Sequence, residues 1–219
     1  MFSKIKRKIL STTRLSGSFL KFYYNNNELE IISSEYNHVF FGYYDKSPFH
    51  VSNHYLLANN LKINNKLFNN DTSLNLGYYQ WVNGDFTTID QTKAWSWQQG
   101  ARLCWHPLYK NVVTYNNIIN GQYRNIFFDI KKKKITNIFD KPSYDLANNG
   151  NISLSLNFER LQKLRPGYGY NSLGNSLISD PAPTKDGIYL TEISNNKSEL
   201  IISLKEIAEY NPTLEMKDS

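Results

Sequence analysis

The stretch ARLCWHPLYKNVVTYNNIINGQYRNIFFDIKKKKITNIFDKP, residues Ala101–Pro142, contains four short apolar segments separated by polar turns. The segments are ARLCWHP, NVVTYNNI, YRNIFFDI and ITNIFDKP, and the last two turns contain Asn-Gly-Gln and four consecutive lysines. β-Branched and aromatic residues favour strands, and Asn-Gly favours a tight hairpin turn. The stretch therefore predicts four strands that follow one another as an antiparallel meander.

The same order of segments recurs along the chain. One unit earlier it reads HVFFGYYDKSPF, HYLLANNL, LGYYQWV and FTTIDQT, and a third unit begins at SYDLANNGNISLSLN and is interrupted by FERLQKLRPGYGYNSLG. A fourth runs from ISDPAPTKDGIYLTEI through SELIISLKEI. Units of four strands, about 40–50 residues each, are typical of β-propeller blades. A β-sandwich, which also has short strands at even spacing, is the alternative.

These units predict an all-β protein with two parts. We expect a basic tail and leading segment over residues 1–34 and a partial propeller of about four blades over residues 35–219. The last segment, LKEIAEYNPTLEMKDS, reads as helix or loop and offers no strand to close a ring. The ring is therefore expected to be incomplete, either because the chain is a fragment or because a protein partner completes it.

The formal net charge of +6 is unevenly distributed. MFSKIKRKILSTTRLSGSFLK (Met1–Lys21) holds six basic residues and no acidic one, and the remaining 19 basic residues are balanced by 19 acidic ones. A neutral body with a basic tail fits a weak contact with an anionic membrane or a partner better than a groove for a phosphate backbone. We expect no nucleic-acid binding and at most peripheral membrane contact through the tail, or else a solvated terminus.

Several kinds of site are not expected. Cys104 is the only cysteine, so the chain has neither a disulfide framework nor a cysteine-based zinc site. The four histidines lack a close metal-binding spacing and are expected on the surface, and GYGYNSLG departs from dinucleotide-binding spacing. No metal and no cofactor are predicted. No apolar run has the length of a signal peptide or a membrane span, which predicts a protein of the cytoplasm or the inner membrane face.

Three motifs carry a resemblance to a known group. HVFFGYYDKSPF (His38–Phe49), WSWQQGARLCW (Trp95–Trp105) and RLQKLRPGYGY (Arg160–Tyr170) together resemble bacterial β-propeller proteins often associated with cell-surface polysaccharide synthesis. These proteins are distantly similar to propellers of the TolB and oligogalacturonate-lyase type. The resemblance covers about Glu35–Leu204. It implies a propeller that matches the N-terminal half of longer chains, and it transfers no metal ligand because the lyases' metal-binding segment has no counterpart here.

The tryptophan-rich motif offers the first candidate site. Alternate residues of a strand face opposite ways, so Leu103, Cys104 and Trp105 are expected to pack between blades. The residues before that strand lie among polar neighbours, where an aromatic face can stack on a sugar ring and carboxamides can pair with its hydroxyls. The alternative is that they brace adjacent blades. These candidate ligand contacts are Trp95, Trp97, Gln98 and Gln99.

Two other segments offer candidate contacts. One places Tyr43, Tyr44, Asp45 and Lys46 at the end of an inner strand, where Asp45 and Lys46 form either an acid–base pair or part of a turn. The other is the inserted loop with Arg165, Tyr168 and Tyr170. An arginine clamps a carboxylate or phosphate through two hydrogen bonds and tyrosines stack, although the loop would also serve as a plug of the ring.

Together these residues predict a carbohydrate-interacting protein of surface-polysaccharide biosynthesis that binds an anionic or lipid-linked glycan. A non-catalytic propeller scaffold for protein assembly is the alternative, since fold alone does not define function. A glycan lyase or hydrolase fragment would need catalytic residues that the sequence does not reveal. Whether the chain is an enzyme therefore stays open at this point.

Overall fold

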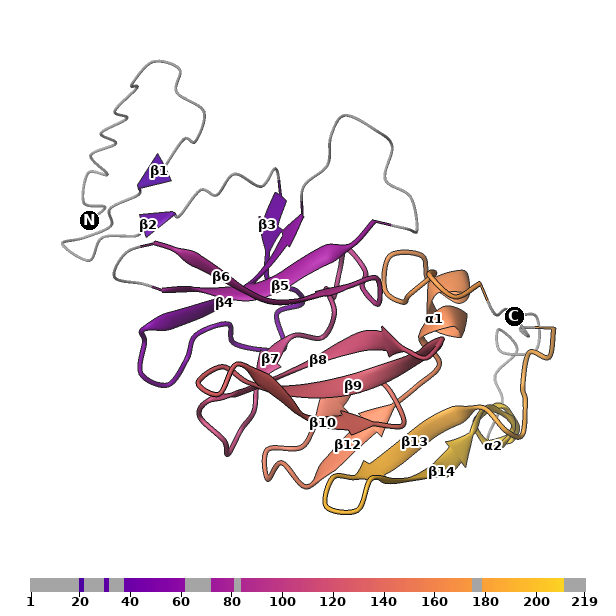
Figure 1. Ribbon diagram of the computed structural model, residues 1–219. Helices are drawn as coiled ribbons and strands as arrows, with labels where there is room; N and C mark the ends of the chain where they lie inside the picture. Colours follow the sequence, from indigo (N-terminus) through magenta and orange to yellow (C-terminus); the bar gives the residue numbers. More distant parts are fainter. Residues whose placement is uncertain are drawn as a thin grey trace, which may run out of the picture.

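The computed structural model describes residues 20–21, 30–31, 38–61, 72–80, 84–174 and 179–210. These residues form three four-stranded antiparallel sheets and one two-stranded sheet, and in each larger sheet consecutive strands are neighbours (Figure 1). Such meanders are the blades of a β-propeller. The described residues form no closed ring of blades. The predicted fold class, an incomplete ring of four-stranded blades, is confirmed for this part of the chain.

The elements follow one another in chain order. The first blade contains β3 (His38–Phe40), β4 (Tyr55–Leu61), β5 (Leu74–Gln80) and β6 (Phe86–Thr92). The second contains β7 (Cys104–Trp105), β8 (Val112–Ile119), β9 (Gln122–Asp129) and β10 (Lys134–Phe139). The third contains β11 (Asp145–Leu146), β12 (Ile152–Ser155), β13 (Gly187–Glu192) and β14 (Lys197–Ser203). The remaining elements are α1 (Phe158–Leu164), α2 (Leu204–Glu209) and the paired β1 (Leu20–Lys21) and β2 (Glu30–Ile31).

The second blade reproduces the meander predicted from residues Ala101–Pro142. Its β8–β9 hairpin turns at Asn120 and Gly121, whose φ angles of 51° and 72° are those of a two-residue turn with both central residues left-handed. The next turn is organised by Asp129, whose carboxylate accepts the backbone N–H groups of Lys131 and Lys132. These hydrogen bonds place the four lysines at an exposed hairpin end.

The third blade corrects the predicted number of units. The third and fourth units of the sequence belong to one sheet, because β12 pairs with β13 along four residues from Ile152 to Ser155. The described residues therefore contain three blades where about four were expected. The inserted segment, which contains α1, lies between the second and third strands of this blade. An insertion inside a hairpin leaves the strand pairing intact but separates its two halves in the sequence.

The hydrophobic core lies between adjacent blades. The larger cluster joins β4 and β5 of the first blade to β8 and β9 of the second, and it includes Leu103, with Trp105 packed against it, as predicted. A smaller cluster joins the second blade to Leu146 of β11. A third cluster, Ala94, Phe158 and Tyr170, packs the inserted segment against the segment that follows β6. Blade faces thus cover one another, which is how a propeller buries both sides of each sheet.

The predicted surface location of the histidines is wrong for two of the four. His50 and His106 are buried, whereas His38 and His54 are exposed. His50 contacts the carbonyl of Lys110 through Nε2 at 2.7 Å and packs against Trp105. Both buried rings lie in turns before the second strand of a blade, where they fill space between neighbouring loops.

Most of the predicted basic tail lies outside the described residues. Of residues 1–34 only β1 and β2 are described. No helix in the described ranges is both long and apolar enough to cross a membrane. The final predicted helix or loop begins as α2, which directly follows β14.

Candidate functional site

The three candidate segments of the sequence lie next to one another in the structure. The backbone N–H of Gln98 donates to the carbonyl of Gly167 at 3.2 Å, and the rings of Tyr43 and Tyr168 meet edge to face at 6.1 Å. Gly42 lies against the carbonyl of Gln99. Loops that are up to 125 residues apart in the sequence, Tyr43 to Tyr168, therefore form one continuous region.

Asp45 and Lys46 connect the first blade to the other two. The Asp45 carboxylate accepts a hydrogen bond from Arg102 Nη2 at 2.8 Å, and Lys46 forms an ion pair with Asp145 of β11. Burial by itself lowers the pKa of Arg102, but the hydrogen bond and charge of Asp45 outweigh it, so the net shift is upward. Each member of the predicted acid–base pair thus has its own partner on another blade. This arrangement favours the turn interpretation over acid–base chemistry.

Tyr43 and Tyr44 form a stacked pair at the edge of this region. Their ring centroids lie 4.2 Å apart, and Tyr44 is 86% exposed. The hydrogen bond with Tyr44, together with burial, raises the pKa of Tyr43 to about 12. The Tyr43 hydroxyl therefore stays neutral at physiological pH. The pair offers flat, uncharged aromatic faces to the solvent.

The two tryptophans have different environments. Trp95 is buried, and its indole N–H donates to the carbonyl of Thr72 at 2.9 Å. Trp97 is 39% exposed and packs its ring against Phe40 at 5.6 Å and edge to face on Trp95 at 5.2 Å. Trp95 is therefore the brace between segments that the alternative interpretation described. Trp97 keeps a ring surface that a ligand can reach.

The two glutamines differ in the same way. Gln98 is exposed beside Gly167, whereas Gln99 is buried and its side-chain amide donates to the Tyr144 hydroxyl at 3.3 Å. Gln99 Oε1 is buried without a hydrogen-bond partner. Only Gln98 is placed for direct contact with a ligand.

The inserted loop also divides its predicted contacts. The Arg165 guanidinium lies 4.5 Å over the ring of Tyr168, and Arg165 is exposed. Tyr170 is fully buried, stacks on Phe158 at 4.2 Å, and its hydroxyl accepts a hydrogen bond from Asn116 at 2.9 Å. Burial raises the pKa of Tyr170. The structure therefore assigns Tyr170 to packing, and it leaves Arg165 and Tyr168 at the surface.

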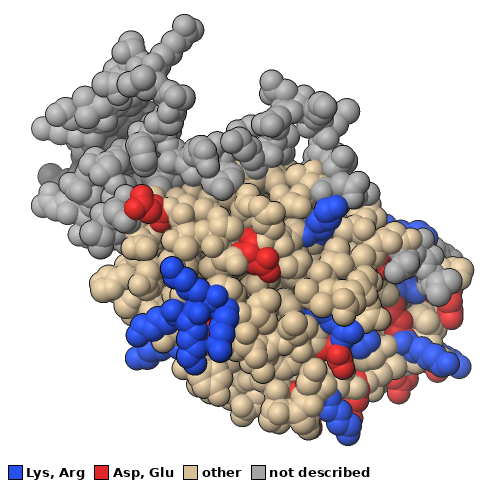
Figure 2. Space-filling view, viewed as in Figure 1, with Lys and Arg blue, Asp and Glu red and all other residues tan. Residues whose placement is uncertain are grey.

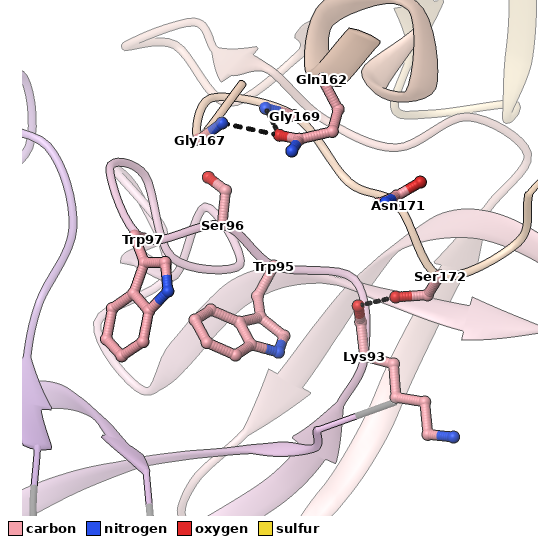
Figure 3. Close-up of a pocket in the computed structure, with 9 residues that line it drawn as sticks. All are labelled: Lys93, Trp95, Ser96, Trp97, Gln162, Gly167, Gly169, Asn171 and Ser172. Carbon is pink, nitrogen blue, oxygen red and sulfur yellow. Dashed lines mark hydrogen bonds between the residues drawn. The ribbon is translucent and has the colours of Figure 1, made fainter. Parts of the chain in front are cut away.

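A small cavity lies between the tryptophan segment and the inserted loop (Figure 3). Gln162 of α1 accepts the N–H groups of Gly167 and Gly169 at 2.9 and 3.3 Å, which holds the loop over Ser96 and Trp97. Gly169 has to be glycine because a Cβ there would collide with backbone atoms of α1. The cavity has a volume of about 50 Å³, enough for a few water molecules but not for a sugar ring. A glycan would therefore lie on the surface rather than inside.

Several residues of the region were not predicted as site residues. Arg102 and Tyr144 form a cation–π contact of 4.7 Å beneath the tyrosine pair, and Asp145 completes the ion pair of Lys46. Arg102 lay inside one of the three motifs, but its positive φ of 55° and its partner Asp45 are visible only in three dimensions. The residues that line the cavity and were also missed are Lys93, Ser96, Gln162, Asn171 and Ser172.

The arrangement has the chemistry of a binding surface. Its exposed members are three aromatic residue types of interaction, a stacked pair, a lone indole and an arginine-covered ring, supplemented by one carboxamide. In the described ranges no three His, Cys, Asp or Glu side chains are grouped to hold a metal ion. The exposed residues, named here the aromatic surface, are Tyr43, Tyr44, Trp97, Gln98, Arg165 and Tyr168.

The comparisons with known proteins bear on the fold alone. No family model matches the chain, and no curated protein matches it. Its structure is similar to TolB from Acinetobacter baumannii, with a TM-score of 0.45, and to a putative TolB from Agrobacterium tumefaciens, with a TM-score of 0.44, each at 11% identity over 78% of this chain. The chain spans 34% and 50% of those two proteins. The association with surface polysaccharides stays a prediction.

Proposed function

We propose that the protein binds an anionic glycan, free or lipid-linked, on the aromatic surface. The observation that carries the proposal is that three separate loops present exposed aromatic rings and a guanidinium next to one another. Tyr44, at 86% exposure, is among the most exposed aromatic residues described. The resemblance of the three motifs to propellers of surface-polysaccharide synthesis supports that pathway as the setting.

The chemistry of the aromatic surface suits a sugar acid. The C–H face of a pyranose stacks on tyrosine or indole rings, and the Arg165 fork is able to pair with a carboxylate in two hydrogen bonds. Stacking on Tyr168 at 4.5 Å limits the orientations of the guanidinium before any ligand binds. Pre-ordering of this kind lowers the entropic cost of binding.

The test is a titration of the purified chain with oligogalacturonate and with neutral cello-oligosaccharides, followed by tryptophan fluorescence. Trp97 should report binding of the acidic sugar. Tyr44→Ala should weaken it about fivefold to tenfold, since an aromatic contact contributes roughly 0.5–1.5 kcal/mol. Tyr210→Ala is the matched control, because Tyr210 is 83% exposed but lies at the end of α2.

Arg165 separates charge from stacking. Arg165→Gln should remove the preference for acidic over neutral sugars, and Arg165→Lys should keep part of it because the charge remains. Ultraviolet absorbance of unsaturated products, recorded in the same cuvette, detects any lyase activity. Equal affinities of Tyr44→Ala, Arg165→Gln and the unmodified chain would refute binding at the aromatic surface.

A second candidate, a scaffold for protein assembly, is favoured by one face of the third blade. Leu154 pairs with Leu190 and Ile188 pairs with Ile202, so these four side chains lie on the same side of the sheet. The opposite side contains the buried residues Ser153 and Thr191. Leu154 and Ile202 remain about 40% exposed. An apolar sheet face of this kind is suited to pack against another sheet.

Sedimentation velocity tests the scaffold candidate. A partner that completes the propeller should bind the unmodified chain and should lose that binding with Leu154→Lys/Ile202→Lys. Glu199→Lys on the same blade is a control for the added charge. If a second copy is that partner, the sedimentation coefficient should rise with protein concentration for the unmodified chain only.

A further inference from the structure

A second and larger concave region lies between the second and third blades. It is a groove of about 760 Å³, lined by the β8–β9 hairpin end, the segment after β10, the β12–α1 junction and the start of β13. Small-molecule sites in proteins have volumes of about 300–1,000 Å³. No residue of the aromatic surface lines this groove. It is therefore large enough for a ligand and separate from the site proposed above.

Two of the four basic residues that line the groove are neutralised by carboxylates. Arg160 is buried and donates through Nε to Asp186 Oδ2 at 3.1 Å and through Nη2 to the carbonyl of Asp180 at 2.8 Å. Arg124 forms an ion pair with Asp140. Asp140 and Asp186 are the two acidic residues of the lining. Both therefore already have an arginine partner.

The other two basic residues are lysines connected through one tyrosine. The Lys141 ammonium lies 4.0 Å over the centroid of the Tyr189 ring, and the Tyr189 hydroxyl donates to the backbone carbonyl of Lys185 at 2.5 Å. In the part of the chain that the structure describes, neither lysine has a carboxylate within 4 Å. The groove thus contains two positive charges that its own acidic residues do not balance.

From this geometry we infer that the groove is a binding site for a small ligand with an anionic group, a phosphate or a carboxylate, held between Lys141 and Lys185. A concave region with charges of one sign concentrates field lines and attracts the opposite charge. Leu156, Phe158 and Pro142 provide apolar wall surface, and Asn157 provides a polar group beside it. This combination of apolar wall and few polar groups is typical of ligand sites.

The surroundings of the groove distinguish it from an ordinary charged surface. Figure 2 shows basic and acidic side chains interspersed over the region of the third blade, where opposite charges compensate one another. Lys131–Lys134, by contrast, occupy an exposed hairpin end that has no concave lining of its own. The hairpin lysines therefore serve as a matched control, because they have similar charge without the groove.

The test is calorimetric titration of the full chain with inorganic phosphate, with glucuronate and with uncharged glucose. We expect saturable binding of phosphate, glucuronate or both, and none of glucose. Lys141→Gln/Lys185→Gln should weaken that binding at least tenfold, whereas Lys131→Gln/Lys134→Gln should leave it within twofold. Lys185→Gln alone, a change at an exposed residue, should weaken binding without any effect on the melting temperature.

The outcomes separate this inference from the glycan proposal. Trp97→Ala and Arg165→Gln should leave phosphate and glucuronate binding in the groove unchanged, because neither residue lines it. Binding of phosphate alone would identify a phosphate-bearing ligand, and binding of glucuronate alone a sugar acid. Equal weakening by the groove pair and the hairpin pair would overturn the site, as would the absence of saturable binding of both anions.

Discussion

His106 should make the packing of the second and third blades sensitive to pH. Its ring is buried, stacks on Tyr109 at 4.6 Å and lies against Gly150 in the turn before β12. Nδ1 accepts the backbone N–H groups of Leu108 and Tyr109, both at 3.1 Å, which leaves no room for a proton on that nitrogen. Burial lowers the pKa of His106 from 6.5 to about 4.

The magnitude follows from proton linkage. Between pH 6.5 and pH 4 the unfolded chain binds a proton at this histidine and the folded chain does not, so acid favours unfolding. The stabilisation is fully present above pH 6.5 and is lost as the pH falls toward 4. With these two pKa values the free energy of unfolding should fall by about 2 kcal/mol between pH 7 and pH 5 on account of His106 alone.

Urea unfolding at pH 7 and pH 5, followed by tryptophan fluorescence, measures this loss. In His106→Asn the side-chain oxygen is able to accept the same N–H groups but does not titrate, so the variant should lose about 2 kcal/mol less than the unmodified chain over this range. His54→Asn removes an exposed histidine and should keep the full loss. Equal losses in the unmodified chain and His106→Asn would show that His106 is charged in the folded protein and would refute the argument.

Three further substitutions test the contacts that hold the loops. Asn116→Ala leaves the buried N–H and C=O of Ser143 unpaired and should reduce the free energy of unfolding by about 2–4 kcal/mol in urea; a loss below 1 kcal/mol would contradict it. Gly169→Ala should displace the inserted loop, seen as faster proteolysis at that loop; an unchanged cleavage rate would contradict the contact with α1. Asp45→Asn should cost about 1–2 kcal/mol, less than for a fully buried pair because Asp45 is 36% exposed, and in a double-mutant cycle with Arg102→Met most of that loss should disappear.

The blades could be predicted from the sequence where turn and strand signals agree. In the second blade the Asn-Gly turn and alternating apolar residues define four consecutive strands, and the structure has all four. In the third blade the insertion separates β12 from β13 by 31 residues between Ser155 and Gly187, so local patterns assign the two halves to different units. Only the pairing of Leu154 with Leu190 shows that they form one sheet.

The candidate site could be predicted as a set of loops but not residue by residue. Aromatic and basic residues in three motifs identified the loops that meet, because such residues are unusual at strand ends. Which rings are exposed depends on the neighbours that each one meets. Trp95 and Trp97 are equivalent by alternation, yet Trp95 reaches the carbonyl of Thr72 and is buried whereas Trp97 is not. Partners such as Tyr144 and Asp145 lie too far away in the sequence to be inferred.

A recurring asparagine connects these two observations. The second strands of the first two blades contain Asn59-Asn60 and Asn116-Asn117, and the first asparagine of each pair reaches the segment that leads into the following blade, at Gly100 and at Ser143. Asn116 both donates to and accepts from the backbone of Ser143 at 2.8 Å, which replaces the ladder hydrogen bonds that separate sheets cannot form with each other. In the third unit the corresponding asparagine, Asn157, instead accepts N–H groups at the start of α1. The same side chain therefore joins blade to blade in two units and begins the insertion in the third, where the regular repeat of the sequence is interrupted.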